Sequence, residues 1–181
     1  PRRPSPGGRP CAAAVGDLAA LRALLAGWRT RGTLNARLET EKQDTLLTWA
    51  ARHGQAEAVR LLLEGGASVG ATTGGGASAL YSACQEGQIE CARLLLEAGA
   101  AMDQVQQNGA TPLLIASQKG HVEIARLLLE AGGATGHAYE YGCPPLYVAS
   151  REGHVEFALL LLEAGAAINQ ACTPLYVACL N

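Results

Sequence analysis

The stretch TPLLIASQKGHVEIARLLLEAGG, residues 111–133, carries the signals for two short helices in succession. Thr111 is a typical helix N-cap, because its hydroxyl can accept a free backbone N–H of the first turn. Pro112 follows at the first helical position, where a missing N–H costs nothing. Gly120 is suited to end this first helix. We therefore expect a first helix of about two turns within residues 111–120.

The second helix is expected within residues 121–133. Ile124, Leu127 and Leu128 recur at helical spacing, which places them on one face. Glu123 and Arg126 stand three residues apart on the opposite face, where they can form an ion pair. Gly132 and Gly133 are predicted to stop the helix.

The same pattern recurs along the chain with a period of 33 residues. Three phases are strictly kept: leucines (Leu47, Leu80, Leu113, Leu146), alanines (Ala50, Ala83, Ala116, Ala149) and glycines (Gly54, Gly87, Gly120, Gly153). A helix pair this short cannot bury its apolar stripe alone, whereas stacked pairs form a continuous core. The sequence thus predicts an all-α solenoid of stacked helix–turn–helix units. A polar, glycine-containing segment such as MDQVQQNGA (102–110) between pairs is suited to a β-hairpin-like finger loop.

The phrase TPLxxAxxxGHxExxxLLLExGA resembles the ankyrin repeat, over about residues 10–181 and best in residues 111–133. The resemblance implies a surface that binds proteins rather than a particular chemistry. The chain departs from the family at the position after the TPL leucine, where a His is usual. The residues there are Thr48, Tyr81, Leu114, Tyr147 and Tyr176. The tyrosines are expected either to replace the hydrogen bond of that His between units or to point into the groove.

The repeat period divides the chain into units. We predict a flexible arm over residues 1–9 and an ankyrin-repeat array over residues 10–181. The array comprises an irregular cap repeat at 10–38, full repeats at 39–71, 72–104, 105–137 and 138–170, and a partial repeat at 171–181. The last unit begins four residues early, at the place of Ala138, Tyr139, Glu140 and Tyr141. This shortfall is either a true deletion or a loop tip missing from the sequence. We favour the second interpretation and expect the array to continue past Asn181.

Composition excludes several classes of function. With 14 basic and 16 acidic residues, the net charge of −2 offers no broad attraction for nucleic acid. No apolar run approaches the ~20 residues that span a bilayer. The six cysteines form no CxxC pair and are expected to be reduced and mostly buried. Cys143 and Cys172 share a phase in adjacent units, and a separation of about 10 Å would exceed the ~7 Å limit for a disulfide. An intracellular, cytoplasmic or nuclear protein is predicted; the arginine-rich leader leaves an organellar location open.

No catalytic or cofactor site is expected. His121 and His154 share the phase where the resemblance implies a structural His, and His53 and His137 lie in a turn and a finger. Equivalent positions about 10 Å apart cannot share a metal ion with bonds near 2 Å. The segment TTGGGAS at Thr72 lacks the GK[ST] ending of a phosphate-binding loop, and we interpret it as a flexible finger tip. We predict no enzyme, no metal and no cofactor.

The resemblance implies that partners bind at the finger tips and at the exposed side of each first helix. Mapped onto this chain, the predicted contact residues are Arg52, Gln85, Gln118, Lys119, Arg151 and Glu152, with Tyr139 and Tyr141 as aromatic anchors on one finger. Leu159 stands where Arg60, Arg93 and Arg126 stand in other units. Beside Phe157, it predicts a small apolar patch on the outer helix layer and a second contact site.

The leading functional hypothesis is a non-enzymatic protein-interaction module or scaffold whose protein partner is not named by the sequence. One alternative is a structural or auxiliary subunit fixed in a larger, possibly organellar, multiprotein complex, which the arginine-rich leader and Leu159 favour. The other is a substrate receptor of a ubiquitin ligase, which requires a ligase-binding tail that the sequence does not contain.

Overall fold

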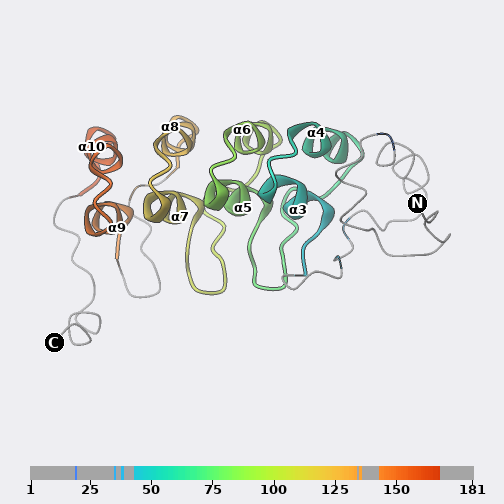
Figure 1. The fold of residues 1–181 in the computed structure, drawn as a ribbon, viewed down its shortest axis with the longest axis horizontal. Coiled ribbons are helices and arrows are strands. Elements are labelled where there is room, and N and C mark those ends of the chain that lie inside the picture. Colours follow the sequence, from blue (N-terminus) through green and yellow to red (C-terminus); the bar gives the residue numbers. More distant parts are fainter. Residues whose placement is uncertain are drawn as a thin grey trace.

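The computed structural model describes residues 43–133 and 143–167, together with positions 19, 35, 38 and 135. The helices in these ranges form four antiparallel pairs that follow one another along the stack (Figure 1). The first helices of the pairs are α3 (Leu46–Arg52), α5 (Ala79–Glu86), α7 (Pro112–Lys119) and α9 (Pro145–Arg151). The second helices are α4 (Ala56–Glu64), α6 (Ile89–Glu97), α8 (Val122–Glu130) and α10 (Val155–Glu163).

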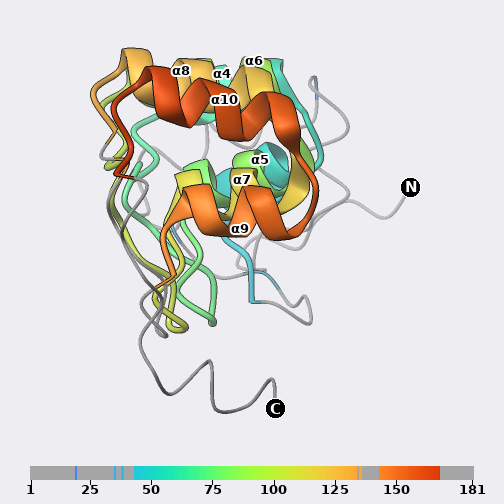
Figure 2. The ribbon, with the colours of Figure 1, turned by 90° about the vertical axis from the view of Figure 1, so that its left-hand side faces the viewer.

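The two kinds of helix form two separate layers. Each first helix packs on the first helix of the next pair, and each second helix does the same in its own layer. Figure 2, viewed along the stack, shows α9 in front of α7 and α5, and α10 in front of α8, α6 and α4. The loops between pairs extend away from the helices on one side, as the finger loops were expected to do. The predicted all-α solenoid is confirmed.

Local signals in the sequence set the helix ends. The side chains of Thr45, Ser78 and Thr111 each accept the backbone N–H three residues later, at 3.2, 3.1 and 3.2 Å. Gly120 closes α7 in the left-handed conformation, with φ +73°, which a residue without a Cβ adopts at little cost. Residues 111–133 therefore fold as their sequence predicts.

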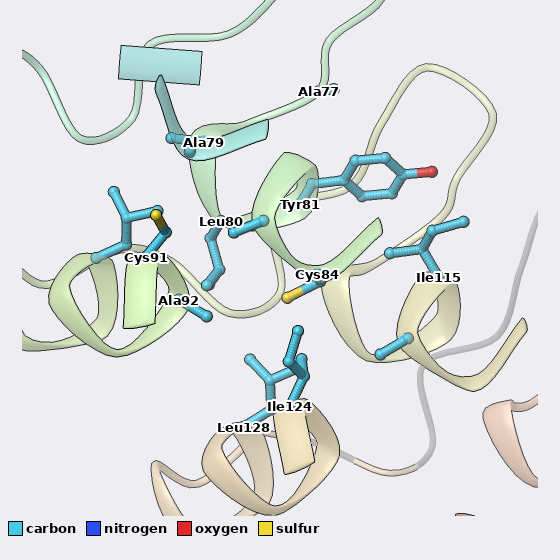
Figure 3. Close-up of a cluster of buried hydrophobic side chains, with 14 of the residues drawn as sticks. Ala77, Ala79, Leu80, Tyr81, Cys84, Cys91, Ala92, Ile115, Ile124 and Leu128 are labelled. Carbon is cyan, nitrogen blue, oxygen red and sulfur yellow. The ribbon is translucent and has the colours of Figure 1, made fainter. Parts of the chain in front are cut away.

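The strictly repeated residues form the core. The four repeated alanines are fully buried, and Leu47, Leu80 and Leu113 are nearly so. Figure 3 shows how the layers meet: Leu80 and Cys84 of α5 lie among Cys91 and Ala92 of α6 and Ile124 and Leu128 of α8. Because alanine is small, the first helices can approach closely, which explains why all four units carry alanine at this phase.

Two cysteines behave as predicted and one does not. Cys84 and Cys91 are buried free thiols. Cys143, also buried, is disulfide-bonded, so the prediction that every cysteine is reduced is wrong. That prediction rested on the regular spacing of equivalent positions and compared Cys143 only with Cys172, which lies outside the described residues.

The outer layer carries one ion pair in each of three successive second helices. Arg60, Arg93 and Arg126 lie 3.8, 3.6 and 3.6 Å from the glutamate three residues earlier. In α10 the equivalent residue is Leu159, which is 54% exposed. The predicted patch needs one correction, because Phe157 is fully buried. Phe157 shares its phase with the core residues Ile124 and Cys91, so it points inward.

None of the helices in the described ranges is long and apolar enough to cross a membrane.

Candidate functional site

The fingers are tight turns whose geometry depends on a left-handed residue. Thr72 and Ser78 form an antiparallel bridge across the second finger. Gly76 and Gly109, 33 residues apart, have φ +82° and +80°. At the same phase the first finger has Gln43, with φ +50°, the one positive-φ residue other than glycine in the described part of the chain. A side chain in this conformation costs about 1–2 kcal/mol, so the fold holds Gln43 under strain.

Neighbouring fingers are tied to one another. Gln107 donates its backbone N–H to the carbonyl of Gly75 at 3.3 Å and its side-chain Nε2 to the carbonyl of Gly74 at 3.1 Å. The glycine segment is therefore an ordered turn in contact with the next finger. The sequence suggested flexibility as its purpose, whereas the structure indicates close packing.

Two histidines connect successive pairs. His121 Nε2 lies 3.3 Å from the carbonyl oxygen of Gln85, and His154 Nε2 lies 3.2 Å from that of Gln118. Each ring covers the glycine that ends the preceding first helix, Gly87 or Gly120. The predicted structural role of His121 and His154 is confirmed. His53 ends α3 and stacks on Trp49, with ring centroids 3.9 Å apart.

Four of the predicted contact residues lie at the ends of first helices and are exposed. Gln118 and Lys119 form the last turn of α7. Arg151 ends α9 and pairs with Glu152, its Nη2 2.6 Å from Oε1. We call the exposed side of the first helices, together with the fingers at residues 72–78 and 105–110, the inner face.

Arg52 and Gln85 have internal partners. The guanidinium of Arg52 lies 2.7 Å from the carboxylate of Asp44, and the two side chains are only 14% and 2% exposed. Arg52 thus neutralises a buried carboxylate at the start of α3, which leaves little of it for a partner. Gln85 is half-buried and donates to the carboxylate of Glu86 at 2.9 Å.

The tyrosine positions divide into three cases. Tyr139 and Tyr141, the predicted anchors, lie outside the described residues. Tyr81 is 4% exposed, and Figure 3 shows its ring beside Ile115 of α7, so it does not project into a groove. Tyr147 is half-buried. At the same phase in α3, Thr48 instead accepts the backbone N–H of Thr45 at 2.8 Å in a reciprocal cap.

A pocket of about 460 Å³ opens on the inner face where three fingers meet. It is lined by Gln43, Thr73, Gly74, Gly75, Ala77, Gln85 and Gln106. None of these described lining residues carries a charged side chain. The pocket combines side-chain amides with glycine backbone, so it offers both hydrogen-bond donors and acceptors.

A comparison with protein families agrees with this architecture. The family model for ankyrin repeats, which describes three copies, matches residues 11–106 and again residues 98–172. The chain belongs to the ankyrin-repeat family. Members of this family are generally protein–protein interaction modules and typically have no enzymatic activity. A comparison with curated proteins gives no match.

Sequence reasoning missed four residues of the ankyrin array's pocket: Gln43, Thr73, Ala77 and Gln106. A signal for Gln43 was present, because it occupies the phase at which the next fingers have Gly76 and Gly109. A non-glycine residue at that phase predicts a strained turn. Thr73 and Gln106 carry no such signal, since their grouping depends on how adjacent fingers pack.

The described part of the ankyrin array contains no group of three or more His, Cys, Asp or Glu residues placed to hold a metal ion. Burial raises the pKa of the Cys84 thiol far above its ordinary value. Burial and the adjacent Glu90 carboxylate raise the pKa of Cys91 to about 11. Both thiols are therefore protonated near neutral pH and are poor nucleophiles.

Proposed function

We propose that this ankyrin array is a non-enzymatic scaffold that binds a partner protein through its inner face. The contact residues we assign are Gln85, Gln118, Lys119, Arg151, Glu152, Tyr139 and Tyr141. Arg52 contributes mainly by holding the start of α3 through Asp44.

The observation that supports this proposal is a contrast between two kinds of repeated position. The core phases keep the same leucine, alanine and glycine in four units. The two phases at the helix ends use more than one residue type: Arg or Gln in one (Arg52, Gln85, Gln118, Arg151), and His, Glu or Lys in the other (His53, Glu86, Lys119, Glu152). A rigid surface for specific recognition requires a repeated core and a varied exposed face. Packing restricts which residues can occupy the core positions, whereas the exposed positions can differ without disturbing the fold.

Co-purification with mass spectrometry tests the proposal. The wild-type chain is compared with a Gln118→Ala/Lys119→Ala variant, whose substitutions remove exposed side chains without touching the core. The control is Glu97→Ala/Glu130→Ala, two exposed residues at the ends of α6 and α8 in the outer layer. We expect a protein that is captured by the wild type and the control but depleted with the inner-face variant. Equal capture by all three would contradict the proposal.

The assigned tyrosines have a separate test on the captured partner. Tyrosine anchors often account for a large share of binding energy. Tyr139→Ala with Tyr141→Ala should weaken binding by more than about 1 kcal/mol while leaving the far-UV circular dichroism of the helices intact. An unchanged affinity would remove these two residues from the site.

A second candidate function is a permanent subunit of a larger complex, and the outer layer favours it. Val155, Leu159 and Leu162 are exposed at i, i+4 and i+7 along α10, which makes one apolar stripe. Leu159→Arg restores the residue of the other units and should release the chain from a large assembly in native size-exclusion fractions. A chain that elutes at the same size with and without the substitution would argue against this candidate.

A further inference from the structure

The pocket between the first three fingers is built differently from the rest of the inner face. At the two tip positions before the left-handed residue, the second finger has Gly74 and Gly75. The third finger has Gln107 and Asn108 at the same phases. Among the described finger tips, the second carries no side chain of its own at these two positions. The Gln43 side chain of the first finger lies against Gly74, whereas Gly75 has no atom closer than 3.8 Å to the place of a Cβ, so another main chain can approach it.

The pocket keeps hydrogen-bonding groups available to a ligand. The carbonyls of Gly74 and Gly75 accept from Gln107, whereas the N–H groups of both glycines donate to no other group in the described part of the chain. The Gln106 side chain likewise has no hydrogen-bond partner among the described residues, and Gln85 uses only its Nε2. Gly74 and Gly75, with these backbone donors, and Gln85 and Gln106, with their side-chain amides, line the same 460 Å³ pocket.

Gln43 adds an independent observation. It keeps φ +50° at a phase where Gly76 and Gly109 adopt the same region without strain. Its side chain lies over the second finger, with Oε1 2.8 Å from the place where a Cβ on Gly74 would stand. The backbone conformation by itself favours glycine at this phase. A strained residue that lines a pocket is a reason to look for function there.

We propose that this pocket binds the main chain of an extended, uncharged peptide segment of the partner protein. A peptide main chain alternates C=O and N–H groups, and the pocket offers neutral donors and acceptors for both. Because none of the described residues that line it carries a charge, an acidic or basic segment would lose hydration against them without gaining an ion pair. This inference rests on the proposed function and specifies what the inner face recognises.

The probe is a phage-displayed library of linear random peptides, panned on the wild-type chain. The affinity of enriched peptides, made synthetically, is then measured by calorimetry on three variants. Gly75→Asn fills the pocket with the residue that the next finger carries at this phase, Asn108. A Cβ at position 75 would meet Gln106 and Thr73 only at 3.8 and 3.9 Å. Gln43→Gly removes one wall while relieving the strained φ. Gly70→Asn is the matched control, because a Cβ at Gly70 has nothing within 4 Å and Gly70 does not line the pocket.

We expect enriched peptides without charged residues at their centre. Their affinity should fall by about tenfold or more with Gly75→Asn and with Gln43→Gly, which corresponds to loss of one or two hydrogen bonds. Gly70→Asn should leave it unchanged. The melting temperature of Gln43→Gly should be no lower than that of the wild type, which separates lost contact from lost fold.

Three results would overturn the inference. The first is peptides that bind Gly75→Asn as tightly as the wild type, and the second is an equal loss with Gly70→Asn. The third is a library that yields no peptide while a folded partner still binds and is lost with Gln118→Ala/Lys119→Ala. In that third case the proposed function stands and only the peptide pocket fails.

Discussion

The contact between Gly120 and His154 offers a quantitative test of how adjacent repeats are coupled. Gly120 ends α7 with φ +73°, and a Cβ built there would lie 2.7 Å from Nδ1 of His154 and 2.8 Å from its Cε1. Gly120→Ala therefore has two costs. The left-handed conformation costs an alanine about 1–2 kcal/mol. The ring must also move away, which breaks its contact with the Gln118 carbonyl and costs about 0.5–1.5 kcal/mol more.

Gly153 and Gly99 provide matched controls. Gly153 occupies the same phase as Gly120, with φ +77°, and Gly99, which follows the C-terminal end of α6, has φ +81°. A Cβ on either would meet nothing within 4 Å. Gly153→Ala and Gly99→Ala should therefore cost only the conformational part, about 1–2 kcal/mol. Gly120→Ala should exceed both by about 1 kcal/mol.

Urea unfolding followed by circular dichroism measures these differences, with the slope compared between variants. A double-mutant cycle isolates the contact. In a His154→Ala background the ring is absent, so Gly120→Ala should lose its excess cost and match Gly153→Ala. His154 has no side-chain capping bond at the start of α10, so removing it disturbs little else. An equal cost of Gly120→Ala in both backgrounds would refute the argument that the ring couples the repeats.

Three further predictions concern buried polar groups. The hydroxyl of Ser82 is buried and has no hydrogen-bond partner in the described part of the chain, so Ser82→Ala should leave the free energy of unfolding unchanged or raise it by about 1 kcal/mol; a loss measured in urea would contradict this. Arg52→Ala should lower the free energy of unfolding by about 3 kcal/mol, because it leaves the Asp44 carboxylate buried without its cation. Arg60→Ala, which removes an exposed ion pair, should lower it by less than about 1 kcal/mol. Similar losses for the two variants in the same urea titration would refute the distinction between a buried and an exposed pair. The raised pKa of Cys91, about 11 against an ordinary 9.0, means that the unfolded chain loses its thiol proton first. The contribution of Cys91 to stability is therefore full below pH 9 and is lost as pH rises from 9 toward 11. Cys91→Ala should lessen the decline in unfolding curves taken across this range, while the part due to Cys84, whose pKa is also raised by burial, should remain.

Repetition made much of the fold predictable from the sequence. Each unit contacts mainly its neighbours, so local signals are sufficient where a larger globular core would need distant ones. Thr111, Pro112 and Gly120 set the limits of α7 as their chemistry predicts. The repeat phase also predicts that Phe157 is buried, because Phe157 lies 33 residues after the core residue Ile124.

The sequence by itself thus determined the helix pairs, their order, the identity of the core and the structural histidines, because these depend on spacing within and between identical units. The tertiary structure decided which exposed positions have internal partners. The charges of Arg52 and Asp44 are eight residues apart, and only the fold brings them together. It also decided the pocket, since Gln43, Gly75 and Gln106 come from three successive fingers and their grouping follows from finger packing rather than from any one segment. The fold is local in origin, whereas the candidate site lies between units and follows from how they pack.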